Sequence, residues 1–164
     1  MRGVIEEARV SGIKAHLKAR DVMTVDPVCV TPGTTIRGLA KILEENQVSG
    51  VPVVDRDGRV IGVVSKSDLI RRCSQGAENA PPAYLFEVLL GGREDDGTEV
   101  IPEALLCVED FMTSPSVTVD AEASLASVAR LMFDKRVHRV IVTDAERFPL
   151  GIITSLDVLG CVQP

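Results

Sequence analysis

The sequence contains one segment twice. When the chain is shifted by 89 positions, residues 21–73 align with residues 110–162 without a gap, and 12 of the 53 aligned pairs are identical. Unrelated sequences would match at roughly 3 of these positions, so the repeat is a genuine duplication. Each copy is too short to bury its own apolar face. We therefore expect the copies to pack face to face and to leave ligand-binding clefts between them.

The composition indicates an aliphatic core and an acidic surface. Apolar residues make up 45% of the 164 residues, but aromatic residues only 3%, and tryptophan is absent. Such a core must consist of Val, Ile, Leu and Ala, which suits an α/β fold with buried strands. The formal net charge of −6 argues against a nucleic-acid-binding groove, which requires a basic stripe. A few local donors would still suffice for a small phosphate ligand.

No segment predicts a membrane span, a secreted protein or a metal site. The longest apolar stretches fall far short of the ~20 residues that cross a bilayer, and Glu6 and Glu7 stand where a secretory signal would be apolar. We therefore expect a cytoplasmic protein. The four cysteines form no CxxC motif and the chain has only two histidines, so we predict no metal ligands. The cysteines are interpreted as packing residues.

Each copy predicts the element order β-α-β-β-α, and the chain therefore has the pattern of a mixed α/β (α+β) fold. The alternating segments 28–30 and 117–119 are typical of strands, and helices are expected to open at Thr34 and Ala123. Apolar residues spaced i, i+3, i+4 and i+7 define one face of each helix: Ile36, Leu39, Ala40 and Leu43, then Leu125, Val128, Ala129 and Met132. Further strands are predicted at 51–54, 60–64, 140–143 and 150–153.

The predicted domain organisation follows the repeat. Residues 21–73 and 110–162 are the two repeats, packed as a pseudo-twofold pair. Residues 1–20 are expected to form an N-terminal helical extension, and residues 74–109 a linker with short helices, the clearest of them at 83–90. That linker helix either docks on its own module or contacts a second subunit or another partner.

Two ordered motifs, each present in both copies, resemble those of cystathionine-β-synthase (CBS) domains. The first reads VSGVPVVD from Val48 and VHRVIVTD from Val137, and the second reads GVVSKSDL from Gly62 and GIITSLDV from Gly151. With the preceding Met-Thr pairs, the repeats cover about two thirds of the chain and resemble a tandem CBS pair, or Bateman module. The resemblance implies a regulatory module that binds AMP, ADP, ATP or S-adenosylmethionine in clefts between the repeats.

The resemblance also implies which residues bind the ligand. In the family's Gly-h-h-Ser/Thr-x-x-Asp motif the aspartate holds the ribose hydroxyls and the hydroxyl residue meets phosphate, at a helix N-terminus that favours anions. One cleft would combine Thr24, Val48, Ser49 and Gly50 with Thr154 and Asp157. The other would combine Thr113, Val137, His138 and Arg139 with Ser65, Ser67 and Asp68. A purely structural interpretation stays open, in which these hydroxyls cap the closing helices and the aspartates complement the helix dipoles.

The two predicted clefts differ in charge. His138-Arg139 in the second copy stands where the first copy has Ser49-Gly50, and an arginine can bind phosphate through two parallel hydrogen bonds. Ser67 adds a hydroxyl where the second copy has a leucine. We therefore predict that the cleft containing Asp68 binds a nucleotide phosphate more tightly.

The sequence favours a sensor over an enzyme. It shows no Ser-His or Cys-His signature, so we predict no catalytic residues. The favoured function is an adenosine-nucleotide sensor that acts on a separate, unknown effector protein and pairs through its helices as a homodimer. It requires no cofactor, although Mg²⁺ could accompany a polyphosphate ligand. The alternative is a structural or interaction module that dimerises through the same helices and binds no ligand.

Overall fold

The computed structural model describes residues 16–75 and 107–162, and these divide into two compact units. The second-repeat unit consists of the described residues 16–27, 58–60 and 116–162. The first-repeat unit consists of the described residues 28–57, 61–75 and 107–115. The linker helix expected at 83–90 lies outside the described residues, and so do residues 1–15 of the expected N-terminal extension.

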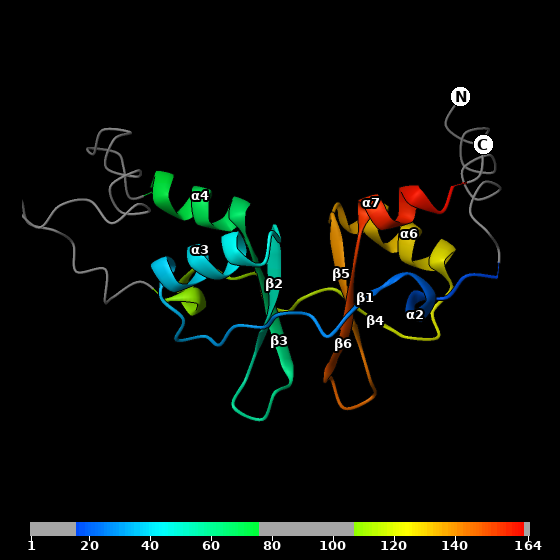
Figure 1. Ribbon diagram of the computed structural model, residues 1–164, viewed down its shortest axis with the longest axis horizontal. Coiled ribbons are helices and arrows are strands. Elements are labelled where there is room, and N and C mark those ends of the chain that lie inside the picture. Colours follow the sequence, from blue (N-terminus) through cyan, green and yellow to red (C-terminus); the bar gives the residue numbers. More distant parts are fainter. Residues whose placement is uncertain (1–15, 76–106, 163–164) are drawn as a thin grey trace, which may run out of the picture. The chain divides into compact units, whose positions relative to one another are not determined.

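The second-repeat unit is built on a four-stranded sheet (Figure 1). Its strands, in the order β1-β6-β5-β4, are β1 (Thr24–Val25), β4 (Thr118–Asp120), β5 (Arg139–Thr143) and β6 (Pro149–Thr154). β5 and β6 form an antiparallel hairpin, β1 is antiparallel to β6, and β4 is parallel to β5. Its helices are α2 (Ala19–Val22), α6 (Leu125–Lys135) and α7 (Ser155–Gly160). α6 and α7 pack against each other and against the hairpin.

The core of this unit is aliphatic, as the composition predicts. Leu125, Val128 and Met132 are buried along α6, and Ala129 packs against them. The predicted apolar face of this helix is thereby confirmed. The strand residues that face it are Val140, Val142 and Ile153, none of which exposes any surface.

The first-repeat unit follows the same plan with a smaller sheet. Its elements are α3 (Ile36–Glu45), β2 (Gly50–Val54), β3 (Val60–Ser65), α4 (Lys66–Gln75) and the 3-10 helix η2 (Val108–Asp110). β2 and β3 form a two-stranded sheet, and α3 packs against α4. Ile36, Leu39 and Leu43 are buried along α3, and Ala40 packs beside them. The apolar face predicted for the helix of the first repeat is therefore confirmed as well.

The strands of the two hairpins agree with the sequence prediction to within one residue, but the strand expected at 28–30 is absent. Only Val30 makes a bridge, parallel to Val53, with its N–H donating to the carbonyl of Pro52 at 3.0 Å. Pro27 and Pro32 flank the segment and have no N–H to donate, so it cannot extend a ladder in either direction. The strand expected at 117–119 is displaced by one residue, to β4.

Both first helices begin later than predicted. Thr35, not Thr34, is the N-cap of α3, and its hydroxyl oxygen accepts a hydrogen bond from the N–H of Gly38 at 3.1 Å. Ser124, not Ala123, caps α6 in the same way. A hydroxyl three residues before a helical N–H satisfies a donor that has no partner within the helix, and alanine cannot do this.

Each compact unit contains the leading segment of the other repeat. α2 and β1, from the start of the first repeat, belong to the second-repeat unit. There the N–H of Ala19 donates to the carbonyl of Ala123 at 2.8 Å, and Ala19 is fully buried. In the first-repeat unit the N–H of Val108 donates to the carbonyl of Thr34 at 2.9 Å, and Val108 is fully buried too. Burying one valine stabilises a fold by about 1.5–3 kcal/mol. The segment that leads into each repeat therefore supplies part of the other repeat's core.

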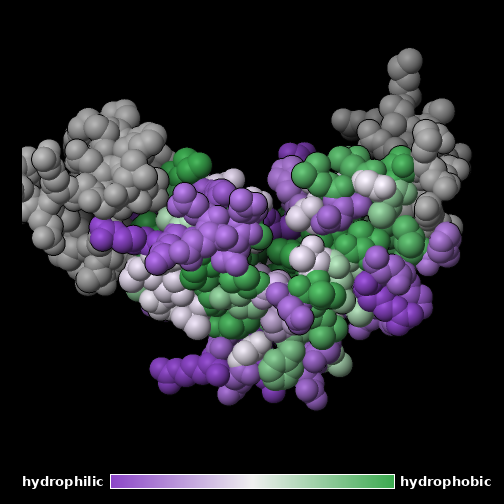
Figure 2. Space-filling model, viewed as in Figure 1, coloured by the Kyte–Doolittle hydropathy of each residue, from purple (hydrophilic) through white to green (hydrophobic). Residues whose placement is uncertain are grey.

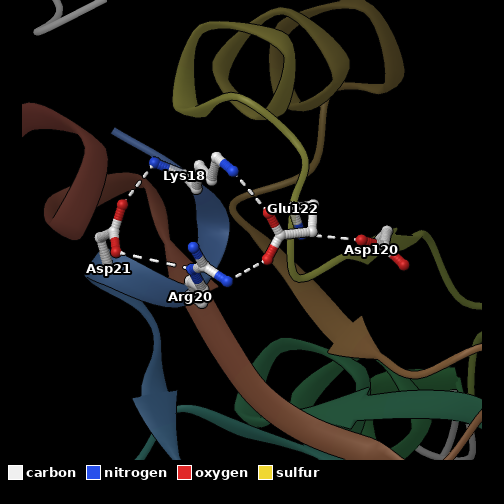
Figure 3. A network of polar contacts seen from close by, with 5 residues as sticks. All are labelled: Lys18, Arg20, Asp21, Asp120 and Glu122. Carbon is white, nitrogen blue, oxygen red and sulfur yellow. Dashed lines mark hydrogen bonds and ion pairs between the residues drawn. The ribbon is translucent and has the colours of Figure 1, made fainter. Parts of the chain in front are cut away.

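Charged side chains also attach the segment around α2 to the rest of the second-repeat unit (Figure 3). Glu122 pairs with both Lys18 and Arg20, and the N–H of Lys18 donates to Asp21 at 2.8 Å. Asp120 accepts a hydrogen bond from the N–H of Glu122 at 2.7 Å. The paired side chains are 41% to 53% exposed, so each ion pair contributes only about 0.2–1 kcal/mol. The backbone hydrogen bonds and the buried Ala19 are therefore the stronger attachment.

A methionine crosses a glycine in each unit. Val25 of β1 lies opposite Gly151 of β6, and a Cβ added to this glycine would lie 2.5 Å from Sδ of Met23. A Cβ added to Gly62 would lie 2.9 Å from the carbonyl oxygen of Thr113 and 3.0 Å from Sδ of Met112. These distances are too short for any side chain, so both positions require glycine because another segment passes directly over them.

We predict that Gly151→Ala lowers the free energy of unfolding by about 1–3 kcal/mol, because the new methyl group would overlap Met23. Urea unfolding followed by circular dichroism measures this change. Gly160→Ala is the matched control: a Cβ there meets nothing within 4 Å, and alanine favours a helix. An unchanged stability of Gly151→Ala would contradict the crossing. Truncating Met23 to alanine in the Gly151→Ala background should recover part of the loss.

Candidate functional site

The Ser-x-x-Asp turn of the first repeat is closed by a carboxylate. Oδ2 of Asp68 accepts hydrogen bonds from the backbone N–H of Ser65 at 2.9 Å and from its hydroxyl at 2.6 Å. β3 ends at Ser65 and α4 begins at Lys66, so both side chains lie at the N-terminus of α4. The other carboxylate oxygen, Oδ1, accepts a hydrogen bond from Nη1 of Arg71 at 3.2 Å. The Asp68 side chain is only 10% exposed.

The second repeat builds the same turn with threonine. Oδ2 of Asp157 accepts hydrogen bonds from the backbone N–H and the hydroxyl of Thr154, both at 2.7 Å. No described residue donates to the other oxygen, Oδ1. The repeat equivalent of Arg71 is Gly160, which has no side chain to offer. In both turns Oδ2 of the aspartate therefore binds the capping residue. The turns differ at Oδ1, which binds an arginine only in the first repeat.

These contacts form a capping arrangement, as the structural interpretation of the sequence expects. A side-chain oxygen satisfies N–H groups that lack partners at the helix N-terminus, and a negative charge there complements the helix dipole. The hydroxyl protons of Ser65 and Thr154 are donated to the carboxylates, so neither hydroxyl has a proton left for a phosphate. The other carboxylate oxygen, Oδ1, called here the outer oxygen, therefore decides what else each aspartate can bind.

The loop before the second strand of each repeat is tied to the same turn. The carbonyl of His138 accepts a hydrogen bond from the N–H of Ser155 at 2.9 Å, and the carbonyl of Ser49 accepts one from the N–H of Lys66 at 3.0 Å. These two pairs are repeat equivalents. They bring the predicted loop residues to the first turns of α7 and α4: Val137, His138 and Arg139 in one unit, and Val48, Ser49 and Gly50 in the other.

The threonines of the two Met-Thr pairs lie on the strand beside each turn. Thr24 is opposite Ile152 of β6, and Thr113 is opposite Val63 of β3. In both cases the partner stands two residues before the hydroxyl residue of the turn. Both threonines are exposed to solvent.

Each compact unit thus carries one set of the residues predicted to bind ligand. The second-repeat unit holds Thr24, Val137, His138, Arg139, Thr154 and Asp157. The first-repeat unit holds Val48, Ser49, Gly50, Ser65, Ser67, Asp68 and Thr113. The combinations predicted for the two clefts draw on residues of both units, and they stay predictions.

The second-repeat unit also has a groove that the sequence did not predict. It lies beside α6 and α7, has a volume of about 700 Å³, and is lined in part by Phe133, Val137, His138 and Leu159. Phe133 and Leu159 are 61% and 63% exposed, and Figure 2 shows hydrophobic surface over these helices. The sequence contains one sign of this groove: Phe133 stands directly before the charged run Asp134–Arg136, where a solvent-exposed polar residue would be expected.

The described residues gather no other recognisable chemistry. They contain no cluster of His, Cys, Asp or Glu that could hold a metal ion. None of their helices is long and apolar enough to cross a membrane. Cys29, Cys107 and Cys161 form no disulfide and are half-buried. Burial raises the pKa of the Cys29 thiol, so this cysteine stays protonated at neutral pH and is not an activated nucleophile.

The chain is similar to curated proteins of different lengths. It is 25% identical to the uncharacterized protein MJ1426 of Methanocaldococcus jannaschii, over 97% of this chain and 98% of that protein. It is also 25% identical to an inosine-5'-monophosphate dehydrogenase of the same organism, but there it spans only 26% of the enzyme. Most of that enzyme therefore lies outside the match.

Solved structures show the same mixed α/β fold. The CBS domain of a CBS domain-containing membrane protein from Sphaerobacter thermophilus matches with a TM-score of 0.68 and 29% identity, over 98% of both chains. CBSX2 of Arabidopsis thaliana, crystallised in complex with AMP, matches with a TM-score of 0.64 and 26% identity, over 87% of this chain and 93% of that one. The fold class predicted from the sequence is confirmed.

A family model supports the same conclusion from the sequence side. The model described as CBS domain matches twice, at residues 19–75 and 108–163, which together make up more than half of the chain. Each match contains one Met-Thr pair and one capped Ser/Thr-x-x-Asp turn. The predicted tandem pair is confirmed: the chain belongs to the CBS domain family, with two CBS domains in tandem.

Proposed function

We propose that this CBS pair is a regulatory module that binds an adenosine nucleotide at its capped turns. The observation that supports this is the outer carboxylate oxygen of Asp157, which accepts no hydrogen bond from the described residues although Oδ2 accepts two. A carboxylate oxygen has two acceptor positions, and the vicinal hydroxyls of a ribose present two donors. The cap holds Asp157 in place, so its free oxygen is positioned before any ligand arrives.

The other predicted residues supply the remaining contacts in this proposal. Val48 and Val137 are half-buried apolar residues, each followed by an exposed residue, Ser49 or His138, and an apolar side chain at such an edge suits an adenine ring. His138 and Arg139 provide an imidazole and a guanidinium for phosphate, and guanidinium groups bind phosphate bidentately.

The similarity to CBSX2 supports AMP as the first ligand to test, since that protein is crystallised with AMP and covers most of this chain. ADP, ATP and S-adenosylmethionine share the adenosine group and belong to the same proposal. Adenine pockets consist mainly of apolar and backbone groups, so the ribose contact alone does not separate these ligands. With ATP, Mg²⁺ would accompany the polyphosphate.

The proposed output is a change in a separate effector protein. A ligand shifts a conformational equilibrium only by its difference in affinity for the two states. Asp157, which would hold the ribose, also caps α7, and the outer side of α7 exposes Leu156 and Leu159. Ligand binding at the turn would thus act on the helix that presents this apolar surface.

We propose no catalytic activity for the chain. General acid–base and nucleophilic catalysis need a base within hydrogen-bond reach of its partner. The sequence has only two histidines, His16 and His138, and neither ring makes a hydrogen bond to a hydroxyl or thiol among the described residues. Incubation with ATP should therefore release no phosphate.

We predict that Asp157→Asn weakens AMP binding at the second-repeat site by about 10-fold or more and leaves the first-repeat site intact, because hydrogen bonds to a charged group contribute about 1.5–3 kcal/mol each. Isothermal titration measures the affinity. The matched control is Asp144→Asn, a carboxylate of the same unit that accepts hydrogen bonds from Glu146 and Phe148 in the β5–β6 loop. It should leave the AMP affinity unchanged.

Thermal denaturation of the wild-type protein gives an independent test of ligand binding. A ligand that binds only the folded state raises the melting temperature, so AMP, ATP or S-adenosylmethionine should each be compared with buffer. If none of them raises the melting temperature, the ligand-binding function is wrong and the interaction module remains.

We also propose that the chain pairs as a homodimer through α6 and α7. Phe133, Leu156 and Leu159 are 61%, 76% and 63% exposed, and Phe133 and Leu159 line the groove described above. Exposed apolar side chains that gather on one face mark an interaction surface. This proposal is independent of ligand binding and is shared with the interaction-module alternative.

The dimer proposal predicts that Leu159→Glu converts the protein to monomers, since a buried charge without a partner opposes association. Sedimentation velocity over a range of concentrations measures the mass. The matched control is Val25→Glu, which places the same charge on a side chain that is 58% exposed in β1 and should leave the mass unchanged. A wild-type protein that sediments as a monomer would contradict the proposal directly.

A further inference from the structure

We propose that Arg71 makes the first-repeat site selective for phosphorylated adenosine ligands. The second-repeat site has Gly160 at the equivalent position, so no such ion pair competes there with a ribose for Asp157. The inference rests on the adenosine-nucleotide function proposed above and assigns one residue outside the Ser/Thr-x-x-Asp motif to ligand choice.

The two aspartates differ in the acceptor positions that they have left. A carboxylate has about four lone-pair positions, two on each oxygen. In both turns Oδ2 uses its two positions for the backbone N–H and the hydroxyl of the capping residue. Oδ1 of Asp157 keeps both of its positions, but Oδ1 of Asp68 has given one to Arg71 at 3.2 Å. A ribose diol therefore cannot make both of its hydrogen bonds to Asp68 while Arg71 stays in place.

The ion pair between Arg71 and Asp68 is weak enough for a ligand to compete with it. It lies one turn after Asp68 on α4, at the i, i+3 spacing, and its side chain is 63% exposed. Exposed ion pairs of this kind change an equilibrium constant by only about 1.5- to 5-fold. The pair therefore lowers the affinity for a competing ribose without preventing its binding.

A phosphate offers the guanidinium an anion in place of Asp68. The planar fork of arginine matches a phosphate group, which accepts two parallel hydrogen bonds from it. AMP thus brings an anion for Arg71 in the same step in which its ribose takes Asp68. Adenosine has no anion, so it must break the ion pair without replacing it. Arg71 should therefore increase the preference of the first-repeat site for AMP over adenosine.

The duplication offers a reciprocal substitution. An added Cβ at Gly160 meets nothing within 4 Å, so Gly160→Arg can be introduced without a clash at its first carbon. It would stand at the same i, i+3 spacing from Asp157 as Arg71 does from Asp68. Gly160→Ala is its matched control, because it adds the Cβ without the charge.

The experiment titrates AMP and adenosine into the full chain by calorimetry, one site at a time. Asp157→Asn isolates the first-repeat site. In that background Arg71→Met, which keeps the apolar stem and removes the charge, should strengthen adenosine binding about 2- to 5-fold and leave AMP binding unimproved. Raising the salt concentration should strengthen adenosine binding with Arg71 present and not with methionine, because salt screens the competing ion pair. A purely structural role of Arg71 would not produce this salt dependence.

The reciprocal arm uses Asp68→Asn to isolate the second-repeat site. There Gly160→Arg should weaken adenosine binding about 2- to 5-fold relative to Gly160→Ala and leave the AMP affinity at least equal. If the wild-type protein binds neither AMP nor adenosine, the proposed function fails and this inference with it. If the wild-type protein binds them but the AMP-to-adenosine preference is unchanged in either arm, only the role of Arg71 is overturned. Circular dichroism checks that each variant is folded, and if Arg71→Met unfolds, the Gly160→Arg arm decides.

Discussion

Two glycines allow the leading segment of one repeat to pass over a strand that belongs to the other, and both cores depend on this passage. With any side chain at Gly62 or Gly151, Met112 or Met23 could not lie where it does. The passage carries the segments that place Ala19 and Val108 in the cores, fully buried. It also sets a threonine strand beside each capped turn. The contact that completes each core is therefore the contact that assembles the candidate site, and a change that loosens one loosens the other.

The capped turn shows why a structural and a functional role need not compete. The cap uses only Oδ2 of each aspartate, because both donors of the capping residue reach the same oxygen. These hydrogen bonds fix the side chain at the helix N-terminus, where the dipole favours its charge. The outer oxygen is then held in one orientation without being used. The structural role thus prepares the aspartate for a ligand, and finding the cap does not argue against binding.

The sequence predicts well those features that depend on local spacing, and poorly those that depend on a distant partner. Helix faces and hairpins follow from periodicity, and the repeated aspartates at 21/110, 55/144 and 68/157 all accept hydrogen bonds from backbone N–H groups within four residues. Segment 28–30 alternates like a strand, but its strand pairing reduces to the single bridge to Val53, which no local pattern reveals. The Ser/Thr-x-x-Asp motif is sufficient to suggest the capped turns. The contact of Arg71 with Asp68 lies one turn beyond that motif, and no local pattern indicates it.

The positions at which the repeats differ are as informative as those at which they agree. Most identical residues cap turns, cross strands or pack in the cores, so the fold restricts both copies equally. Residues at the edge of the candidate site differ in charge: Arg71 against Gly160, and Ser49-Gly50 against His138-Arg139. None of these edge residues is fully buried except Gly50, and an exposed position tolerates substitution at little cost to stability. A duplicated module can therefore change what each of its sites binds through residues that the fold does not constrain, while the caps and crossings keep both copies folded.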